Sequence, residues 1–266
     1  MSTLDLSRQG PLAQVWLNRP DLRNAFDDDT IAELTQTFLR LGQDNTVRAI
    51  VLGAHGKAFC AGADVNWMRK MAGYSWAENH ADATRLADML WAIANCPVPV
   101  IARVQGDCYG GGVGLVAACD IAIATHSAHF CLSEVKLGLI PATISPYVVN
   151  AMGERAARRY TLTAERFDAP RAQAVGLVHE VCQLEALDAT VQQITQAIMA
   201  NGPQAVKAGK QLIHAVAHQP NTPELRDQTA RRIADIRASD EGRAGLQAFL
   251  DKRTPPWQQP SEGHPA

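Results

Sequence analysis

Residues 98–124 read VPVIARVQGDCYGGGVGLVAACDIAIA and contain two short apolar runs, Val98–Val104 and Asp120–Ala124. Between the two runs lie three consecutive glycines and an apolar stretch of helical character. A strand, a crossover helix and a second strand at these distances are typical of parallel pairing. Because the runs are largely apolar on both faces, we expect a sheet that other elements cover on each side.

Earlier segments extend the same alternation towards the N-terminus. Ala13–Leu17 (AQVWL) and Ala49–Leu52 (AIVL) are predicted strands. Thr30–Leu41 and Ala77–Asn95 are predicted helices, and the apolar residues of the second follow a 3.6-residue spacing. Together these patterns predict an α/β fold with a largely parallel sheet.

From residue 146 onward the sequence becomes mostly helical, with one late strand predicted at Gly176–Val181 (GLVHEV). Residues 254–266, TPPWQQPSEGHPA, are polar and rich in proline, and they predict a frayed end. The predicted helices are Pro146–Met152, Leu184–Met199, Pro203–His218, and Pro223–Leu250 with an interruption near Ser239 and Asp240.

The composition of the chain excludes several classes of protein. The chain has 266 residues, a formal net charge of −2 and six cysteines without a CxxC pair. The charge argues against a surface for nucleic acid or anionic membranes, and no apolar run approaches the ~20 residues of a membrane helix. The cysteines predict reduced thiols and no metal site, and the first residues lack the pattern of a signal peptide. We therefore expect a cytoplasmic location.

The first segment with chemical potential is Gly56–Val65 (GKAFCAGADV), which follows a predicted strand. Gly62 lies between small residues, so the backbone there can turn tightly and expose N–H groups to a ligand. The alternative is an ordinary strand-to-loop turn in which Asp64 caps the following helix.

The second segment is Gly106–Asp120 (GDCYGGGVGLVAACD). Glycines at the start of a helix let a negatively charged oxygen approach unpaired N–H groups and the positive end of the helix dipole. The segment lacks the endings of a phosphate loop and of a dinucleotide fingerprint. The alternative is close packing of a buried helix.

The third segment is Phe130–Pro141 (FCLSEVKLGLIP), in which Glu134 stands among apolar residues. Burial favours the neutral acid and raises the pKa, which makes a carboxyl group a usable proton carrier near neutral pH. The alternative is a glutamate paired with Lys136 or a nearby arginine.

The order and flanks of these three segments resemble the crotonase family of enoyl-CoA hydratases and isomerases. The resemblance covers Leu12 to Trp257 and includes LNRPDLRNAF, AFCAGAD, ACDIAIAT, SEVKLGLIP, RYTLTAERFDAPRAQAVGLVHEV and EGRAGLQAFLDKR. It implies a spiral of ββα turns over residues 1–195, which holds a CoA-ester site. It also implies a helical C-terminal region over residues 196–266 that forms homotrimers, often paired into hexamers.

The resemblance also implies the catalytic groups. Ala63 and Gly111 align with the two backbone N–H donors of the family's oxyanion hole, and Glu134 aligns with the second catalytic glutamate. The first glutamate of the two-carboxylate hydratases is missing, because Gly114 occupies its place. Glu134 must then do most of the work, unless another acid helps, for which Asp107 is a weak candidate.

For the substrate, the resemblance implies an acyl-CoA thioester, with coenzyme A entering as part of the substrate and no separate cofactor. An aromatic side chain suits the adenine face and cations suit the phosphates. The Phe249 and Lys252 pair is expected to reach a neighbouring subunit. The expected substrate-binding residues are Arg23, Ala61, Ala63, Asp64, Val65, Asn66, Gly111, Phe249 and Lys252.

The flanks most resemble bacterial methylglutaconyl-CoA and isohexenylglutaconyl-CoA hydratases, so the expected reaction is hydration of 3-methylglutaconyl-CoA in leucine degradation. A distal carboxylate on the acyl chain asks for a cation, for which Arg69 and Lys70 are candidates, although a solvated helix face explains them as well. One alternative is an enoyl-CoA isomerase with Glu134 as its single base. Another is a non-enzymatic member that binds CoA esters, or RNA through Arg155, Arg158 and Arg159.

Overall fold

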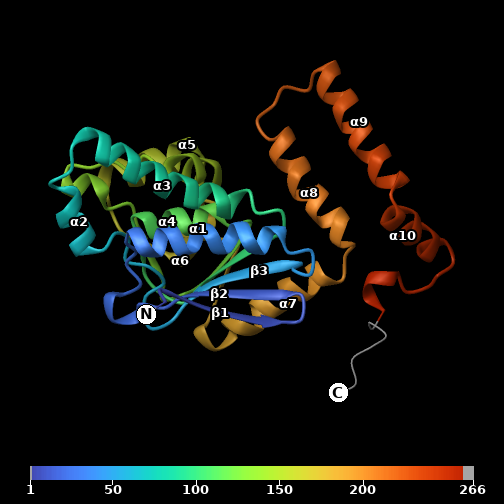
Figure 1. Ribbon diagram of the computed structural model, residues 1–266, viewed down its shortest axis with the longest axis horizontal. Helices are drawn as coiled ribbons and strands as arrows, with labels where there is room; N and C mark the ends of the chain where they lie inside the picture. Colours follow the sequence, from blue (N-terminus) through green and yellow to red (C-terminus); the bar gives the residue numbers. More distant parts are fainter. Residues whose placement is uncertain (1, 260–266) are drawn as a thin grey trace.

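The computed structural model describes residues 2–259, and it is built on a six-stranded sheet in the order β1-β2-β3-β4-β6-β9 (Figure 1). All neighbours in this sheet pair in parallel except β1, which pairs antiparallel with β2. The strands are β1 (Leu4–Gln9), β2 (Leu12–Leu17), β3 (Ala49–Ala54), β4 (Val100–Val104), β6 (Ile121–Thr125) and β9 (Glu180–Cys182).

A smaller sheet stacks the second strands of successive turns of the chain. It consists of β5 (Cys108–Tyr109), β7 (His129–Cys131) and β8 (Phe167–Asp168). Isolated parallel bridges continue the stack, from Cys60 to Cys108 and from Phe26 to Ala63. Each turn therefore gives one strand to the large sheet, one extended segment to the small stack, and then a helix, which is the ββα spiral expected from the resemblance.

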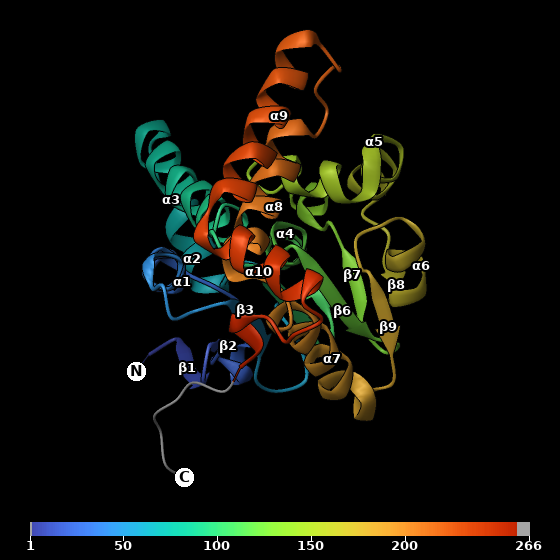
Figure 2. The ribbon, with the colours of Figure 1, turned by 90° about the vertical axis from the view of Figure 1, so that its right-hand side faces the viewer.

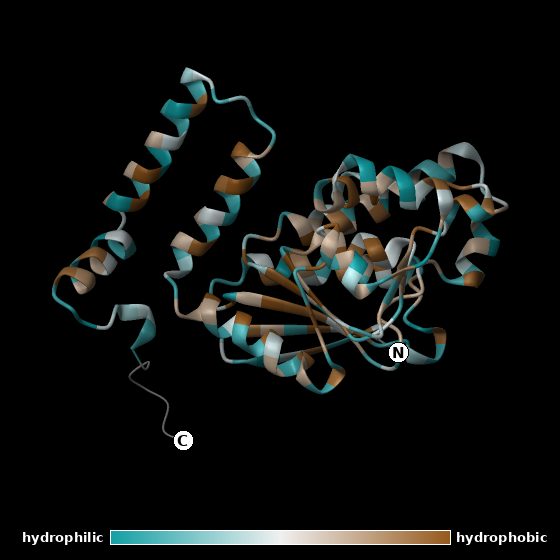
Figure 3. Ribbon diagram, turned by 180° about the vertical axis from the view of Figure 1, so that it is seen from behind, coloured by the Kyte–Doolittle hydropathy of each residue, from teal (hydrophilic) through white to brown (hydrophobic). Residues whose placement is uncertain are grey.

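Helices cover both faces of the large sheet, as the apolar strands predict. On β3, Ile50 and Leu52 face the main core beneath α1 and α3, whereas Val51 faces Leu187 and Val191 of α7. Figure 3 shows hydrophobic residues concentrated along these strands. The helices of this part are α1 (Asp28–Gln43), α2 (Val65–Met71), α3 (Trp76–Ala94), α4 (Gly111–Ala118), α5 (Ser145–Thr163), α6 (Ala169–Ala174) and α7 (Leu187–Met199).

Three C-terminal helices extend away from this core in Figure 1, and they lie in front of it in Figure 2. They are α8 (Pro203–Val216), α9 (Pro223–Ala238) and α10 (Asp240–Leu250). Neither α8 nor α9 buries a residue. Residue 195, where the sequence places the end of the core, lies inside α7, which continues to Met199 along the sheet.

Most predicted elements are confirmed, and the departures have local causes. The predicted break near Ser239 is present, because that residue ends α9 and its side chain caps α10. The helix predicted over Pro146–Met152 continues to Thr163 after a non-helical step at Gly153, with φ +72°. The prediction of a frayed end is wrong for Pro256–Gln258. These residues form a 3-10 turn, in which the Trp257 Nε1–H donates to the Ala200 carbonyl at 3.1 Å. Residues 260–266 of the predicted tail lie outside the described residues.

All six cysteines are free thiols, as predicted, and four of them are buried. Burial raises the pKa of the Cys60 thiol to about 12, so it is protonated and unreactive at neutral pH. Among the described residues, none of the helices combines the length and the apolar character that crossing a membrane requires.

Candidate active site

The three segments that the sequence singles out meet in one cavity of about 540 Å³. Ala63 comes from the loop after β3, Gly111 from the start of α4, and Glu134 from a 3-10 turn, Glu134–Leu137, that follows β7. The rest of the wall is mostly apolar and is formed by α2, α3 and residues 137–144. The lining also includes Phe26, Trp67, Asn79, Asp82, Leu86 and Ile144.

The loop at Ala63 leaves its N–H free for a ligand. Gly62 has φ +89°, and a Cβ there would lie 2.9 Å from the Tyr109 carbonyl oxygen, so only glycine fits this turn. The flanking backbone is paired with Phe26, since the Phe26 N–H donates to the Gly62 carbonyl and the Asp64 N–H donates to the Phe26 carbonyl, each at 2.9 Å. Within residues 2–259, the Ala63 N–H donates to no protein acceptor.

The glycine run aims a second N–H at the same place. Gly111 is the first residue of α4, so its N–H has no partner within the helix. A Cβ at Gly62 would lie 3.7 Å from the Gly111 nitrogen, so the two amide-bearing turns are adjacent. Gly110 has φ +51° and ψ −123°, which glycine alone adopts readily. The two N–H groups can therefore bind one partly negative oxygen.

Glu134 sits against this turn with an unsatisfied oxygen. A Cβ at Gly110 would lie 3.2 Å from Glu134 Oε1, while Oε2 is buried without a hydrogen-bond partner among the described residues. The alternative of a pair with Lys136 or an arginine is wrong, because Glu134 forms no ion pair in the described chain. Burial raises the pKa of Glu134, and only a hydrogen bond from its own backbone opposes the shift.

This burial predicts a pH-dependent gain in stability when Glu134 is replaced by Gln. A carboxyl whose pKa is raised on folding stabilises the native state while it is protonated, and that stability is lost as pH rises through the folded pKa. At pH 7 Glu134 therefore destabilises the fold, because this pH lies above the pKa of the group in the unfolded chain, and the neutral amide removes this effect. We expect Glu134→Gln to raise the Tm at pH 7 and to raise it less near pH 4. An equal gain at both pH values would contradict the assigned burial.

Gly114 cannot be replaced by a second acid without moving the core. A Cβ at this position would lie 2.2 Å from Ile144 Cγ2 and 3.6 Å from Leu90 Cδ2. Ile144 is 2% exposed and also lines the cavity. The space in which a glutamate from residue 114 would project is therefore filled by a hydrocarbon side chain.

Asp82 is a cavity residue that sequence reasoning missed. Its side chain is 5% exposed, and its Oδ1 accepts hydrogen bonds from Arg85 at 2.7 Å and from the Trp67 indole at 3.4 Å. Asp82, Leu86 and Leu90 lie on one face of α3. Asp82 and Leu90 are eight residues apart, which is about 12 Å along a helix. Because Leu90 packs beside Gly114, Asp82 lies at the end of this cavity that is farther from Gly114. Asn79 lines the same end.

A second cavity of about 650 Å³ shares Ala61 with the first. Arg23 and Lys57 line it and can meet phosphate charges. Asp107 also lines this second cavity, where it accepts from the Tyr109 hydroxyl at 2.6 Å and pairs with Arg166 at 3.3 Å. Asp107 is not part of the cavity that holds Glu134, so the structure gives no support to it as the second acid.

Asp64 is the predicted helix cap. Its Oδ1 accepts from the Asn66 N–H at 2.7 Å, and its Oδ2 pairs with Arg19 at 3.0 Å. Both oxygens of its buried side chain are thus engaged, so a ligand could contact only the backbone of Asp64. Val65 and Asn66 are exposed at the start of α2 and line neither of these two cavities.

The remaining predicted contacts lie elsewhere. Phe249 is exposed on α10, at the opposite end of the molecule from α2 (Figure 1), so one chain does not bring Phe249 and Lys252 to its own site. Their contact with a neighbouring subunit stays a prediction. Arg69 bonds to Asn66 and Lys70 pairs with Asp28, and neither Arg69 nor Lys70 lines the cavity that holds Glu134.

The described residues give no support to a metal site or to an RNA-binding surface on α5. Across residues 2–259 no group of three or more His, Cys, Asp or Glu side chains is arranged to hold a metal ion. In the basic segment of α5, Arg158 pairs with Glu154 and Arg159 pairs with Glu165, which lowers the net positive charge available to RNA.

Comparison with known proteins gives the same picture along nearly the whole chain. Residues 7–260 match the family described as enoyl-CoA hydratase/isomerase. An enoyl-CoA hydratase of Alternaria alternata is 34% identical over 263 residues, which cover 96% of this chain and 84% of the relative.

Solved structures agree with the fold. An enoyl-CoA hydratase from Shewanella pealeana is 45% identical, with a TM-score of 0.93 and 96% of both chains covered. An enoyl-CoA hydratase/isomerase from Marinobacter aquaeolei is 35% identical, with a TM-score of 0.92, over 97% of this chain and 100% of that one. The two free N–H groups beside a half-buried glutamate lie in a spiral that these relatives share, and the chain belongs to the enoyl-CoA hydratase/isomerase family, the crotonases.

Proposed function

We propose that the protein is an enoyl-CoA hydratase in which Glu134 is the principal proton carrier and the N–H groups of Ala63 and Gly111 form the oxyanion hole. The observation that carries the proposal is the convergence of these three groups in one largely apolar cavity. A thioester oxygen bound by the two N–H groups gains negative charge as the reaction proceeds. Donors that are already in place stabilise that charge more than they stabilise the ground state.

The reaction follows from this geometry. The Glu134 carboxylate takes a proton from water, and the water oxygen forms a bond to C3 of the enoyl thioester. The π electrons move to the thioester oxygen, which becomes an enolate held by Ala63 and Gly111. The protonated Glu134 then delivers its proton to C2, the carbonyl re-forms, and the carboxylate is regenerated. One carboxylate thus serves as base and then as acid, which suits a site without a glutamate at residue 114.

The far end of the pocket supports a polar-ended acyl chain. Asp82 is buried at this end, and an apolar chain would leave its second carboxylate oxygen against hydrocarbon, which is unfavourable for a buried polar group. The lining contains no lysine or arginine, and Arg85 is the cation bonded directly to a lining residue. The finer proposal, a short 3-methyl-branched chain with a distal carboxylate as in 3-methylglutaconyl-CoA, rests on the sequence resemblance, and Arg85 is the cation that can offset the repulsion between that carboxylate and Asp82.

A substrate panel tests this proposal. Purified protein is assayed with 3-methylglutaconyl-CoA, its uncharged isostere 3,5-dimethyl-2-hexenoyl-CoA, and linear crotonyl-CoA, by loss of the 2-enoyl absorbance. We expect hydration in all active cases, and a kcat/KM about tenfold or more higher for the carboxylated chain than for its isostere, because ~1.4 kcal/mol corresponds to tenfold. An equal or better rate for the isostere would remove the polar-end argument. Conversion of a 3-enoyl substrate without water addition would favour the isomerase.

The exposed apolar face of the C-terminal helices supports assembly of several copies. Homotrimers, or hexamers built from two trimers, stay the proposed state, and they would also bring α10 of one copy towards another. Large apolar side chains are exposed on all three helices: Leu212, Ile213, Ile233, Leu246, Phe249 and Leu250.

A further inference from the structure

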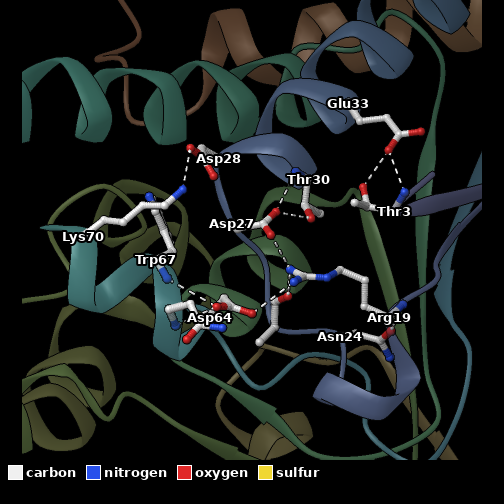
Figure 4. A network of polar contacts seen from close by, with 12 residues as sticks. Thr3, Arg19, Asn24, Asp27, Asp28, Thr30, Glu33, Asp64, Trp67 and Lys70 are labelled. Atoms are coloured by element: carbon white, nitrogen blue, oxygen red, sulfur yellow. Dashed lines mark hydrogen bonds and ion pairs between the residues drawn. The ribbon is translucent and has the colours of Figure 1, made fainter. Parts of the chain in front are cut away.

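Arg19 lies next to the loop that carries the Ala63 N–H, and it bonds to two separate chain segments (Figure 4). Its Nη1 donates to the Ala25 carbonyl at 2.8 Å and pairs with Asp27 Oδ2 at 2.9 Å. Its Nη2 pairs with Asp64 Oδ2 at 3.0 Å. The Arg19 side chain is 19% exposed and that of Asp64 is 6% exposed, so little solvent competes for these bonds.

These two segments bracket the Ala63 N–H. Asp64 is the next residue along the chain, whereas Ala25 and Asp27 flank Phe26, whose backbone bonds to both neighbours of Ala63. The guanidinium therefore fixes the spacing between the two strands of this bridge. A shift of either segment would turn the Ala63 N–H away from the thioester oxygen.

The same bridge reaches the second donor through the ring of Phe26. A Cβ at Gly111 would lie 2.3 Å from Phe26 Cζ, so the ring packs directly on the Gly111 backbone. Trp67 also packs against this ring, with centroids 6.0 Å apart. One aromatic residue thus contacts both amide-bearing turns, and Arg19 holds the backbone on either side of it.

We propose that Arg19 is the positioning residue of the oxyanion hole. The second oxygens of its two partners are already engaged as helix caps, Asp27 Oδ1 with the Thr30 N–H at 3.0 Å and Asp64 Oδ1 with the Asn66 N–H at 2.7 Å. Arg19 therefore ties the first turns of α1 and α2 to the Ala63 loop. A planar guanidinium can reach two carboxylates and a carbonyl at once, whereas a lysine ammonium is a single point charge.

The experiment separates positioning from simple support of the fold. We expect Arg19→Lys, which keeps the charge, to lower kcat by about 10²-fold with little change in KM, because misplacement of a catalytic group by 1 Å costs about that much. A second readout is acetoacetyl-CoA, whose enolate absorbs in the near ultraviolet and carries the charge that the N–H groups bind. The fraction of bound probe in the enolate form should fall in the variant, measured at a temperature where the variant is folded.

A matched control is Arg8→Gln, which removes an exposed pair with Asp44 at 2.9 Å, far from the site, and should leave both readouts unchanged. If Arg19→Lys does not fold, Asp64→Asn decides, because asparagine keeps the cap of α2 but weakens the bond to Arg19. A folded variant of either kind with normal kcat and a normal enolate fraction would overturn the proposal.

This inference rests on the proposed oxyanion hole but can be separated from the hydratase assignment. If no enoyl-CoA is hydrated by the wild type, yet the enolate fraction depends on Arg19, the positioning role stands and the proposed reaction fails. If hydration proceeds normally in folded Arg19→Lys, the reaction stands and the positioning role fails.

Discussion

Replacing Glu134 by Gln is expected to lower kcat for water addition by about 10²–10⁴-fold, the usual contribution of a positioned acid or base. The amide has the shape of the carboxyl group but can neither accept the proton of water nor return one to C2. The oxyanion donors are backbone groups and remain, so the affinity for the CoA ester should change little. Stopped assays over a range of substrate concentrations give kcat and KM separately.

The control for this prediction is Glu185→Gln, an exposed glutamate in the 3-10 turn before α7, which should leave kcat unchanged. Because the fold should be more stable with Gln at residue 134, a lower kcat cannot be attributed to unfolding. A Glu134→Gln enzyme that retains most of its hydration rate would sink the single-carboxylate mechanism.

The candidate catalytic groups were assigned from the resemblance to the crotonase family, and local signals in the sequence agree with that assignment. A glycine run before an apolar helix, and a glutamate among apolar residues, each imply unpaired or desolvated polar groups without knowledge of the fold. It remained to be established that the three segments lie together in the fold. The parallel sheet brings their turns to one edge, and the cavity that holds Ala63, Gly111 and Glu134 confirms that they come together.

Arg19, Phe26 and Asp82 could not be predicted, because their roles depend on contacts between distant segments. Arg19 is 45 residues from Asp64 in the chain, and Trp67 is 15 residues from Asp82. No periodicity records such contacts, and an arginine before a proline looks like a surface residue. The position of Gly114 was visible in the sequence, but only the packing of Ile144 shows why no acid fits there.

The strands could likewise be predicted only where their own residues show a clear apolar pattern. Buried strands such as β3 and β4 have continuous apolar runs, so the sequence indicates them clearly. Strand β1 buries only Leu4, so it has no alternating pattern, and β5 and β8 have two residues each. The second layer of the spiral consists of β5, β7, β8 and isolated bridges, all of three residues or fewer, which is why the spiral does not emerge from periodicity alone.

Gly111→Pro is expected to remove nearly all activity, by about 10²–10³-fold from the lost N–H donor alone. Proline lacks the N–H group but is well tolerated at the first position of a helix, which is where Gly111 stands in α4. The backbone can therefore keep its helical start while one of the two bonds to the enolate oxygen disappears. The enolate fraction of bound acetoacetyl-CoA should fall together with kcat.

Any side chain at residue 111 also collides with Phe26, since its Cβ would lie 2.3 Å from Cζ of that ring. Gly111→Ala provides the matched variant, because alanine adds the same Cβ and keeps the N–H. The difference between the two variants isolates the donor: both should show lower stability by thermal unfolding, and the proline variant should lose about 10²-fold more kcat than the alanine variant. Equal losses in the two folded proteins would assign the effect to displacement of Phe26, and Gly111 would then have no role as an oxyanion donor.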